Sequence, residues 1–311
     1  LGITNQNTGD FKGAIEAFGQ VFRQYPQSSL KNVCRYKMGE SYFRLGDYKN
    51  CVAMMTDVVS AVGDRNMVVK GYYLLGEANY QLGNFALARK NYQIAYEEFP
   101  NEPIAPDAME AVGWTYFQEK RYDLASEIFQ TVIQKYPKGE NLDSAWFRLA
   151  LTRKLAGNSA GAIEAYREII KRFPESGNAA KSLYEIGMIS YDAGQFDEAA
   201  EYFQQLSSKY PKSDIKPDAL TMYGQSVLEN KEYQSALIAF TEVTESYRTD
   251  NSYPAALYQR SFCEFKLDRL EDAARSAAAF IKAFPDHTLA PEALLVIAET
   301  LYRLGDYEGS K

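Results

Sequence analysis

The sequence has few of the residues that build disulfide frameworks and metal sites. Its 311 residues include 3 cysteines and 1 histidine. Cys34, Cys51 and Cys263 are too few and too scattered for a disulfide framework or a thiolate metal site. His287 alone excludes any site that needs two imidazoles. We therefore predict no metal and no cofactor.

Long apolar runs and an excess of positive charge are also missing. No run of about 18 apolar residues occurs, so we predict no membrane-spanning segment in this sequence. Lys and Arg total 34 against 41 Asp and Glu, a net charge of −7. This balance argues against nucleic-acid binding, which needs concentrated positive charge. With 46% apolar residues, the chain is not disordered as a whole.

An aromatic residue followed by proline recurs at multiples of 37 positions along the whole chain. The pairs are Tyr25-Pro26, Phe99-Pro100, Tyr136-Pro137, Phe173-Pro174, Tyr210-Pro211 and Phe284-Pro285. Val62-Gly63 and Tyr247-Arg248 occupy the two places in the series where proline is missing. A fixed period of this length is the signature of a repeat architecture.

Three further markers keep the same step. A turn-like triplet recurs at Gly9-Asp10-Phe11, Gly46-Asp47-Tyr48, Gly83-Asn84-Phe85, Lys120-Arg121-Tyr122, Gly157-Asn158-Ser159, Gly194-Gln195-Phe196, Lys231-Glu232-Tyr233, Asp268-Arg269-Leu270 and Gly305-Asp306-Tyr307. A small residue recurs at Gly2, Gly39, Gly76, Gly113, Ala150, Gly187, Gly224, Ser261 and Ala298. A second small residue recurs at Ala14, Cys51, Ala88, Ala125, Ala162, Ala199, Ala236 and Ala273.

Each cycle predicts two helices joined by a tight turn. Proline suits the first turn of a helix, as at Pro217, and the turn glycine suits a left-handed helix end. The following Asp or Asn can cap the second helix, which the aromatic-proline pair ends. Small residues let the two helices approach closely. We expect the aromatics at 18, 92, 129, 166, 203 and 240 to fill the space between neighbouring pairs, which must stack to bury their apolar faces.

The order small residue, Gly-(Asp/Asn)-aromatic, Ala, aromatic, Pro resembles the tetratricopeptide repeat. One cycle matches it at Gly187, Gly194, Phe196, Ala199, Phe203 and Pro211. The resemblance implies an all-α, right-handed superhelical solenoid of about eight helix-turn-helix repeats, a single array over 1–311. Departures at Ser159, Leu270, Ala277, Gly63 and Arg248 suggest local loosening.

The period of 37 exceeds the usual 34 of this repeat. The segment 210–224 is similar to repeats of bacterial cell-envelope proteins, namely a periplasmic coordinator of the Tol–Pal system and a lipoprotein of the outer-membrane β-barrel assembly machinery. The resemblance implies a periplasmic or other extracytoplasmic bacterial location, with the cytoplasm as the alternative. Because neither end has a polar capping repeat, we expect the sequence to be a piece of a longer chain.

By the same resemblance, partners bind a concave face lined by the first helices. Helical periodicity picks out three rows of positions on these helices. The candidate partner-binding residues are Tyr36, Glu40, Phe43, Tyr73, Glu77, Tyr80, Trp114, Phe117, Phe147, Tyr184, Met188, Tyr191, Tyr258, Phe262 and Phe265.

Two interpretations of these rows stay open. The aromatic rows recur so regularly that they fit packing between repeats. The row holding Glu40, Glu77, Trp114, Met188 and Phe262 varies from cycle to cycle, as a partner-specific groove would. Its two glutamates either favour a basic partner segment or belong to a solvated face. The lysines and asparagines of a carboxylate clamp, which some members of the family use, are missing.

Catalytic motifs are equally scarce. We expect His287 to be a solvent-exposed loop residue, and Cys51 and Cys263 to be buried, inert thiols. The sequence therefore favours a non-enzymatic scaffold that binds another protein or peptide. The alternative is a structural spacer or assembly arm of a larger secretion or exopolysaccharide-export protein. An enzyme is the least favoured reading.

Overall fold

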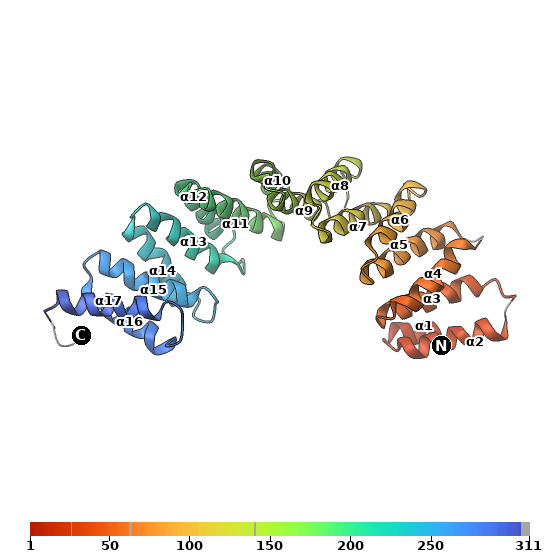
Figure 1. Ribbon diagram of the computed structural model, residues 1–311, viewed down its shortest axis with the longest axis horizontal. Coiled ribbons are helices and arrows are strands. Elements are labelled where there is room, and N and C mark those ends of the chain that lie inside the picture. The colour runs from red at the N-terminus through yellow and green to blue at the C-terminus, as the bar shows by residue number, and fades with distance from the viewer. Residues whose placement is uncertain (26, 62–63, 140, 306–311) are drawn as a thin grey trace. The chain divides into compact units, whose positions relative to one another are not determined.

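The computed structural model describes residues 1–25, 27–61, 64–139 and 141–305, and every element drawn in Figure 1 is a helix. The first helices of successive pairs are α1 (Gly2–Asn7), α3 (Lys31–Arg44), α5 (Arg65–Gln81), α7 (Ala105–Gln118), α9 (Leu142–Leu155), α11 (Gly177–Asp192), α13 (Lys216–Glu229), α15 (Tyr253–Lys266) and α17 (Ala290–Arg303). The second helices are α2 (Phe11–Gln24), α4 (Tyr48–Ser60), α6 (Phe85–Glu97), α8 (Tyr122–Lys135), α10 (Ser159–Arg172), α12 (Phe196–Lys209), α14 (Tyr233–Ser246) and α16 (Leu270–Ala283). The predicted all-α solenoid of helix pairs is confirmed.

The chain forms two compact units, Leu1–Ala162 and Ile163–Lys311, whose boundary falls within α10. From α1 to α9, and again from α11 to α17, each helix packs against the next one along the chain. First helices of neighbouring pairs also pack together, as α3 on α5 and α15 on α17. Each unit is therefore a stack of helix pairs in which every pair packs against its neighbours.

The close approach predicted for the small residues occurs inside each pair. A Cβ added to Gly187 on α11 would lie 2.7 Å from the ring of Phe203 on α12, closer than real side chains come. The same arrangement holds for Gly76 with Tyr92, Gly113 with Phe129, and Gly224 with Phe240. The aromatics thus fill space within their own pair as well as between pairs, where Phe203 also clusters with Ala219 of α13. The predicted filling between pairs occurs at Phe203, and the structure adds a contact within the pair that was not predicted.

The tight turns between paired helices use the left-handed backbone that glycine favours. Six turn glycines have positive φ, at Gly9, Gly46, Gly83, Gly157, Gly194 and Gly305. The cap prediction holds for Asp10, Asp47 and Asn158, whose side chains accept from Gly13, Asn50 and Gly161 amides. Asn84 makes no such bond. Pro26, Val62-Gly63 and Asp306-Tyr307 lie outside the described residues.

Three turns adopt the same backbone without glycine. Lys120, Lys231 and Asp268 have φ of 59°, 62° and 60°. At Lys231 the amide donates to the carbonyl of Leu228 (2.8 Å), and the Glu232 amide donates to Val227 (2.9 Å), the paired bonds of a Schellman helix end. A side chain with a Cβ is strained here by about 1 kcal/mol.

Lys231→Gly is expected to stabilise the α13–α14 pair by about 0.5–1 kcal/mol, because relief of this strain exceeds the added freedom of the unfolded chain. Hydrogen exchange of the α13 and α14 amides measures the gain. Lys181→Gly, in the interior of α11, is the matched control and is expected to cost about 1 kcal/mol. Loss of protection at Lys231→Gly would contradict the strain argument.

The second helices end at the aromatic position whether or not proline follows. α12 ends at Lys209 before Tyr210-Pro211, and α14 ends at Ser246 before Tyr247-Arg248. Tyr210 and Tyr247 have nearly the same backbone, with φ of −122° and −130°. The sequence analysis attributed this helix end to the aromatic-proline pair. Because α14 ends at the same position without a proline, proline is not the sole cause of the helix end.

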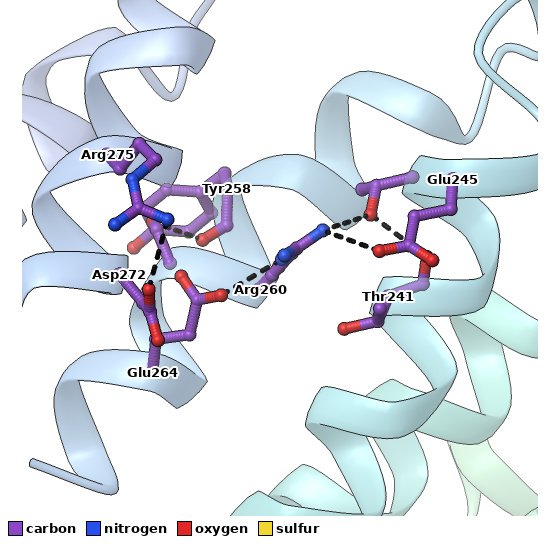
Figure 2. Close-up of polar contacts among 9 residues, drawn as sticks. Thr241, Glu245, Tyr258, Arg260, Glu264, Asp272 and Arg275 are labelled. Atoms are coloured by element: carbon purple, nitrogen blue, oxygen red, sulfur yellow. Dashed lines mark hydrogen bonds and ion pairs between the residues drawn. The ribbon is translucent and has the colours of Figure 1, made fainter. Parts of the chain in front are cut away.

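A polar cluster ties α14 to α15 in the second unit (Figure 2). Arg260 Nε lies 2.9 Å from Glu264 Oε1, one turn along α15. Its Nη1 donates to the Thr244 hydroxyl on α14 at 3.1 Å and lies 3.8 Å from Glu245. The Glu264 side chain is only 4% exposed, so Arg260 supplies the charge that makes its burial tolerable.

Candidate functional site

All fifteen predicted surface residues lie on first helices, on α3, α5, α7, α9, α11 and α15. Fourteen of them are partly exposed. Phe265 is the exception, at 3% exposure, and packs in a cluster with Ala273, Ala277 and Val296. Because its ring is enclosed by neighbouring helices, Phe265 is not available to a partner, and its inclusion in the surface was wrong.

The two aromatic rows are anchored mainly within their own helix pairs. Phe43 meets Tyr48 edge-on at 5.4 Å between ring centroids, and Tyr191 meets Phe196 at 5.3 Å. The same contact joins Tyr80 to Phe85 and Phe117 to Tyr122, while Tyr73, Tyr184 and Tyr258 contact Tyr92, Phe203 and Phe280. These rings pack, as one interpretation had it, but largely inside a pair rather than between repeats.

The predicted row that varies from cycle to cycle makes different contacts in different repeats. Its members are Glu40, Glu77, Trp114, Met188 and Phe262. Glu40 is paired with Lys37 at 2.7 Å, and Phe262 lies under the Lys266 ammonium at 5.1 Å. Met188 packs at the edge of the cluster around Phe203. These residues keep part of their surface in solvent.

A hollow of about 390 Å³ opens between α5, α7 and α9 in the first unit, and we call it the α5–α7 hollow. Its lining is rich in aromatic and acidic side chains. The lining residues are Tyr73, Glu77, Tyr80, Tyr92, Asp107, Glu110, Ala111, Trp114, Asn141 and Arg148. Four of the predicted residues, Tyr73, Glu77, Tyr80 and Trp114, are therefore brought together from two consecutive repeats.

Hydrogen bonds fix the floor of the α5–α7 hollow. The Tyr92 hydroxyl donates to Glu77 Oε1 at 2.7 Å. Burial raises the pKa of Tyr73 and of Tyr92, and the Glu77 carboxylate beside them raises both further. Both hydroxyls therefore stay protonated at neutral pH and remain hydrogen-bond donors.

Arg148 and Trp114 form part of the lining of the α5–α7 hollow and contact each other. The Arg148 guanidinium of α9 pairs with Glu110 of α7 and lies 5.3 Å from the Trp114 ring centroid. Trp114 in turn meets Phe117 at 5.1 Å and Phe129 at 5.8 Å. One edge of Trp114 is thus held by the core while the rest faces the hollow.

A second hollow of about 590 Å³, the α3–α5 hollow, shares Tyr73 and Glu77 with the first. It adds Tyr36, Glu40 and Phe43 of the prediction, with Gln6, Phe11, Arg44, Lys70, Leu74 and Ile104. Phe117 and Phe147 line neither hollow. The remaining predicted residues lie in the second unit on two first helices, α11 and α15, which are separated in the chain by the α13–α14 pair. They are Tyr184, Met188 and Tyr191 on α11, and Tyr258 and Phe262 on α15.

A sequence profile described as tetratricopeptide repeat matches residues 36–103, 73–140, 147–214, 184–251 and 264–310, and a second profile of the same description matches 1–28. The chain belongs to the tetratricopeptide repeat family. Such repeats generally form non-enzymatic scaffolds for protein–protein interaction.

Solved structures share the fold of this tetratricopeptide repeat protein. The C-terminal part of a repeat-containing protein from Cytophaga hutchinsonii aligns over 82% of this chain and 98% of its own, with a TM-score of 0.67 and 14% identity. A tetratricopeptide repeat protein from Parabacteroides merdae aligns over 83% and 95%, with a TM-score of 0.52 and 16% identity. At these identities the likeness concerns the fold alone. No curated protein sequence matches the chain.

Asp107 and Arg148 are among the residues of the α5–α7 hollow that the sequence analysis of this repeat protein did not identify. Asp107 lies three residues before Glu110 and seven before Trp114, a spacing that places all three on one helix face. Periodicity could therefore have found Asp107. Arg148 comes from the next repeat, and no pattern marked it because its position varies widely. The equivalents in other cycles are Lys37, Leu74, Ala111, Glu185, Met222, Gln259 and Val296.

The candidate nucleophiles of the repeat array are enclosed. Cys34, Cys51 and Cys263 are buried free thiols, as predicted for the last two. Burial raises the pKa of Cys51 and of Cys263 to about 12, so their thiolates are scarce at neutral pH.

His287 lies in a loop, as expected, but it is less exposed than predicted. Its ring is half-buried and meets Phe280 edge-on at 5.5 Å. Its Nδ1 accepts a hydrogen bond from the Leu289 amide at 3.1 Å, which ties the loop to the start of α17. Among the residues that the structure describes, no helix is long and apolar enough to cross a bilayer.

Proposed function

We propose that this protein is a scaffold that binds a peptide segment of another protein along its first helices, anchored in the α5–α7 hollow. The observation that carries the proposal is the meeting of Trp114, Tyr73, Tyr80 and Glu77 in one hollow of about 390 Å³. A volume of roughly 300–1,000 Å³ suits a site that takes up a ligand group. Three of these four side chains are aromatic, and rigid aromatics give contact area at low entropic cost.

The neighbouring α3–α5 hollow extends this surface. Because Tyr73 and Glu77 line both hollows, a bound segment can pass from one to the other without leaving the protein surface. An extended or helical segment fits such a track, with side chains entering the hollows as anchors. Phe117 and Phe43 support the lining through their ring contacts with α8 and α4.

Trp114→Ala is expected to weaken peptide binding about thirtyfold, since a central tryptophan typically contributes about 2 kcal/mol at an interface. Peptides selected from a displayed random library are titrated by fluorescence polarisation against the wild-type chain and the variant. Leu87→Ala is the matched control, because Leu87 is an apolar residue 52% exposed on the second helix α6.

Circular dichroism separates loss of the site from loss of the fold in Trp114→Ala. Equal affinities for Trp114→Ala and Leu87→Ala would remove the α5–α7 hollow from the proposal. Failure to select any peptide from the library would favour the other role, a spacer or assembly arm whose activity lies in other parts of a larger protein.

The same proposal places the protein outside the cytoplasm of a bacterium. Its support is the similarity of the segment 210–224 to repeats of bacterial cell-envelope proteins. Fractionation of the source cells tests this location.

A further inference from the structure

The α5–α7 hollow carries an excess of negative charge. Three carboxylates line it, those of Glu77, Asp107 and Glu110, against the single guanidinium of Arg148. Among the described residues, no cation forms an ion pair with Glu77 or Asp107 within 4 Å, although the charge of Arg148 partly offsets the rise that burial causes in the pKa of Asp107. Three carboxylates against one guanidinium give the lining a formal net charge of −2.

The adjoining α3–α5 hollow provides an internal comparison. Its lining holds two acidic side chains, Glu40 and the shared Glu77, and two basic ones, Arg44 and Lys70, so its formal net charge is zero. Glu40 is also held by Lys37 at 2.7 Å. The negative potential is thus a property of the α5–α7 hollow and not of the whole surface, so charge alone distinguishes two sites of similar aromatic content.

Aromatic side chains lie in the same lining as the carboxylates of Glu77 and Asp107. Tyr73, Tyr80 and Trp114 are partly exposed in the lining, and each can present ring surface to a group in the hollow. A cation within about 6 Å of such rings is attracted by their quadrupoles, most strongly when it loses water. Carboxylates and aromatic rings together select for positive charge on a side chain with an apolar stem.

One cation of the protein already binds in this hollow through a carboxylate and an aromatic ring together. Arg148 contacts both the Glu110 carboxylate and the Trp114 ring, at 5.3 Å from its centroid. This guanidinium pairs with Glu110 and acts on Asp107 through its charge, and it forms no ion pair with Glu77 within 4 Å. Arg148 therefore shows that the lining accepts a cationic side chain. The hollow of about 390 Å³ that remains beside it can take a second one.

We propose that the α5–α7 hollow is a recognition site for a basic side chain, lysine or arginine, of the peptide segment that the scaffold binds. The inference rests on the proposed function and specifies its partner as a basic segment. Glu77 and Asp107 provide the opposing charge, and Tyr73, Tyr80 and Trp114 pack against the stem. Arg148 competes with the incoming cation for Asp107 and repels it through its like charge.

The direct test follows the tryptophan indole signals of the full chain by NMR. Of the 2 tryptophans, Trp114 is assigned by the loss of the other signal in Trp146→Phe. The probes are acetylated, amidated pentapeptides with a central lysine, arginine, norleucine or glutamate flanked by glycines. The lysine and arginine peptides are expected to shift the Trp114 signal with affinities at least about fivefold above that of the norleucine peptide, and the difference is expected to shrink with added salt.

Two glutamates of the first unit make a matched pair of variants, one in the α5–α7 hollow and one on a second helix. Glu77→Gln is expected to weaken binding of the basic peptides about fivefold to tenfold, as loss of one close opposite charge does. Glu127→Gln is expected to leave binding unchanged, because Glu127 is exposed on α8 and lines neither hollow. Arg148→Met, which keeps a stem over Trp114 but removes the competing charge, is expected to strengthen it several-fold, an effect that damage to the fold would not produce.

Equal binding of the norleucine and lysine peptides would overturn the inference, as would equal effects of Glu77→Gln and Glu127→Gln. If library peptides bind in a Trp114-dependent way but show no basic preference, the scaffold function stands and the cation site falls. If the library yields no peptide yet the lysine pentapeptide shifts Trp114 and depends on Glu77, the site stands and the extended binding track falls.

Discussion

Phe203→Ala is expected to lower the free energy of unfolding of the helices around it by about 3–5 kcal/mol, the usual cost of truncating an enclosed phenylalanine. Phe203 is 0% exposed and packs in one cluster with Leu183 of α11 and Ala219 of α13. Its ring also fills the space that Gly187 leaves. Truncation therefore removes contacts within a pair and between pairs at once.

The loss is expected to be local, because stability in a stacked array is a sum of repeats and nearest-neighbour interfaces. Hydrogen exchange should show reduced protection in α11, α12 and α13 and no change in α3 to α5. Gln204→Ala, the exposed neighbour on α12, is the control and should stay within about 0.5 kcal/mol of wild type. A uniform loss of protection along the chain would contradict the nearest-neighbour picture.

Arg260→Met is expected to destabilise the α14–α15 contact by about 2–4 kcal/mol. The variant leaves the Glu264 carboxylate, 4% exposed, without its 2.9 Å partner (Figure 2). The other oxygen of Glu264 is already buried without a hydrogen-bond partner among the described residues. Removing one member of a buried pair costs several kcal/mol because the remaining charge is uncompensated, and the 27% exposure of Arg260 moderates this figure.

Two further variants separate the buried charge from simple loss of contact. Arg260→Met combined with Glu264→Leu should recover most of the loss, since no buried charge then remains. Glu245→Gln, whose partner atom lies 3.8 Å away and whose side chain is 63% exposed, should cost less than about 1 kcal/mol. Urea titration monitored by exchange of α14 and α15 amides gives the values. An Arg260→Met effect no larger than that of Glu245→Gln would show that the pair does not stabilise this interface.

The candidate site was only partly within reach of the sequence. Row periodicity placed Tyr73, Glu77 and Trp114 on neighbouring first helices, because a 37-residue step returns each helix to the same register. It could not tell that Phe265 is enclosed by α16 and α17, since its equivalents Phe43 and Tyr80 are partly exposed. Exposure depends on which side chains the next repeat presents, and these differ from cycle to cycle.

Local chemistry determined the elements of this protein. The 37-residue period, the turn glycines and the small buried residue of each second helix, alanine or Cys51, specify helix, turn and packing face through contacts between residues close in sequence. The left-handed backbone at Lys231 and the helix end at Tyr247 show that packing keeps the repeat geometry even where the favoured residue is missing. Only the tertiary structure brought Arg148 onto Trp114 and gathered three carboxylates around this single cation in the α5–α7 hollow. Charge balance in a hollow depends on side chains from separate repeats, and no periodic pattern within one helix records it.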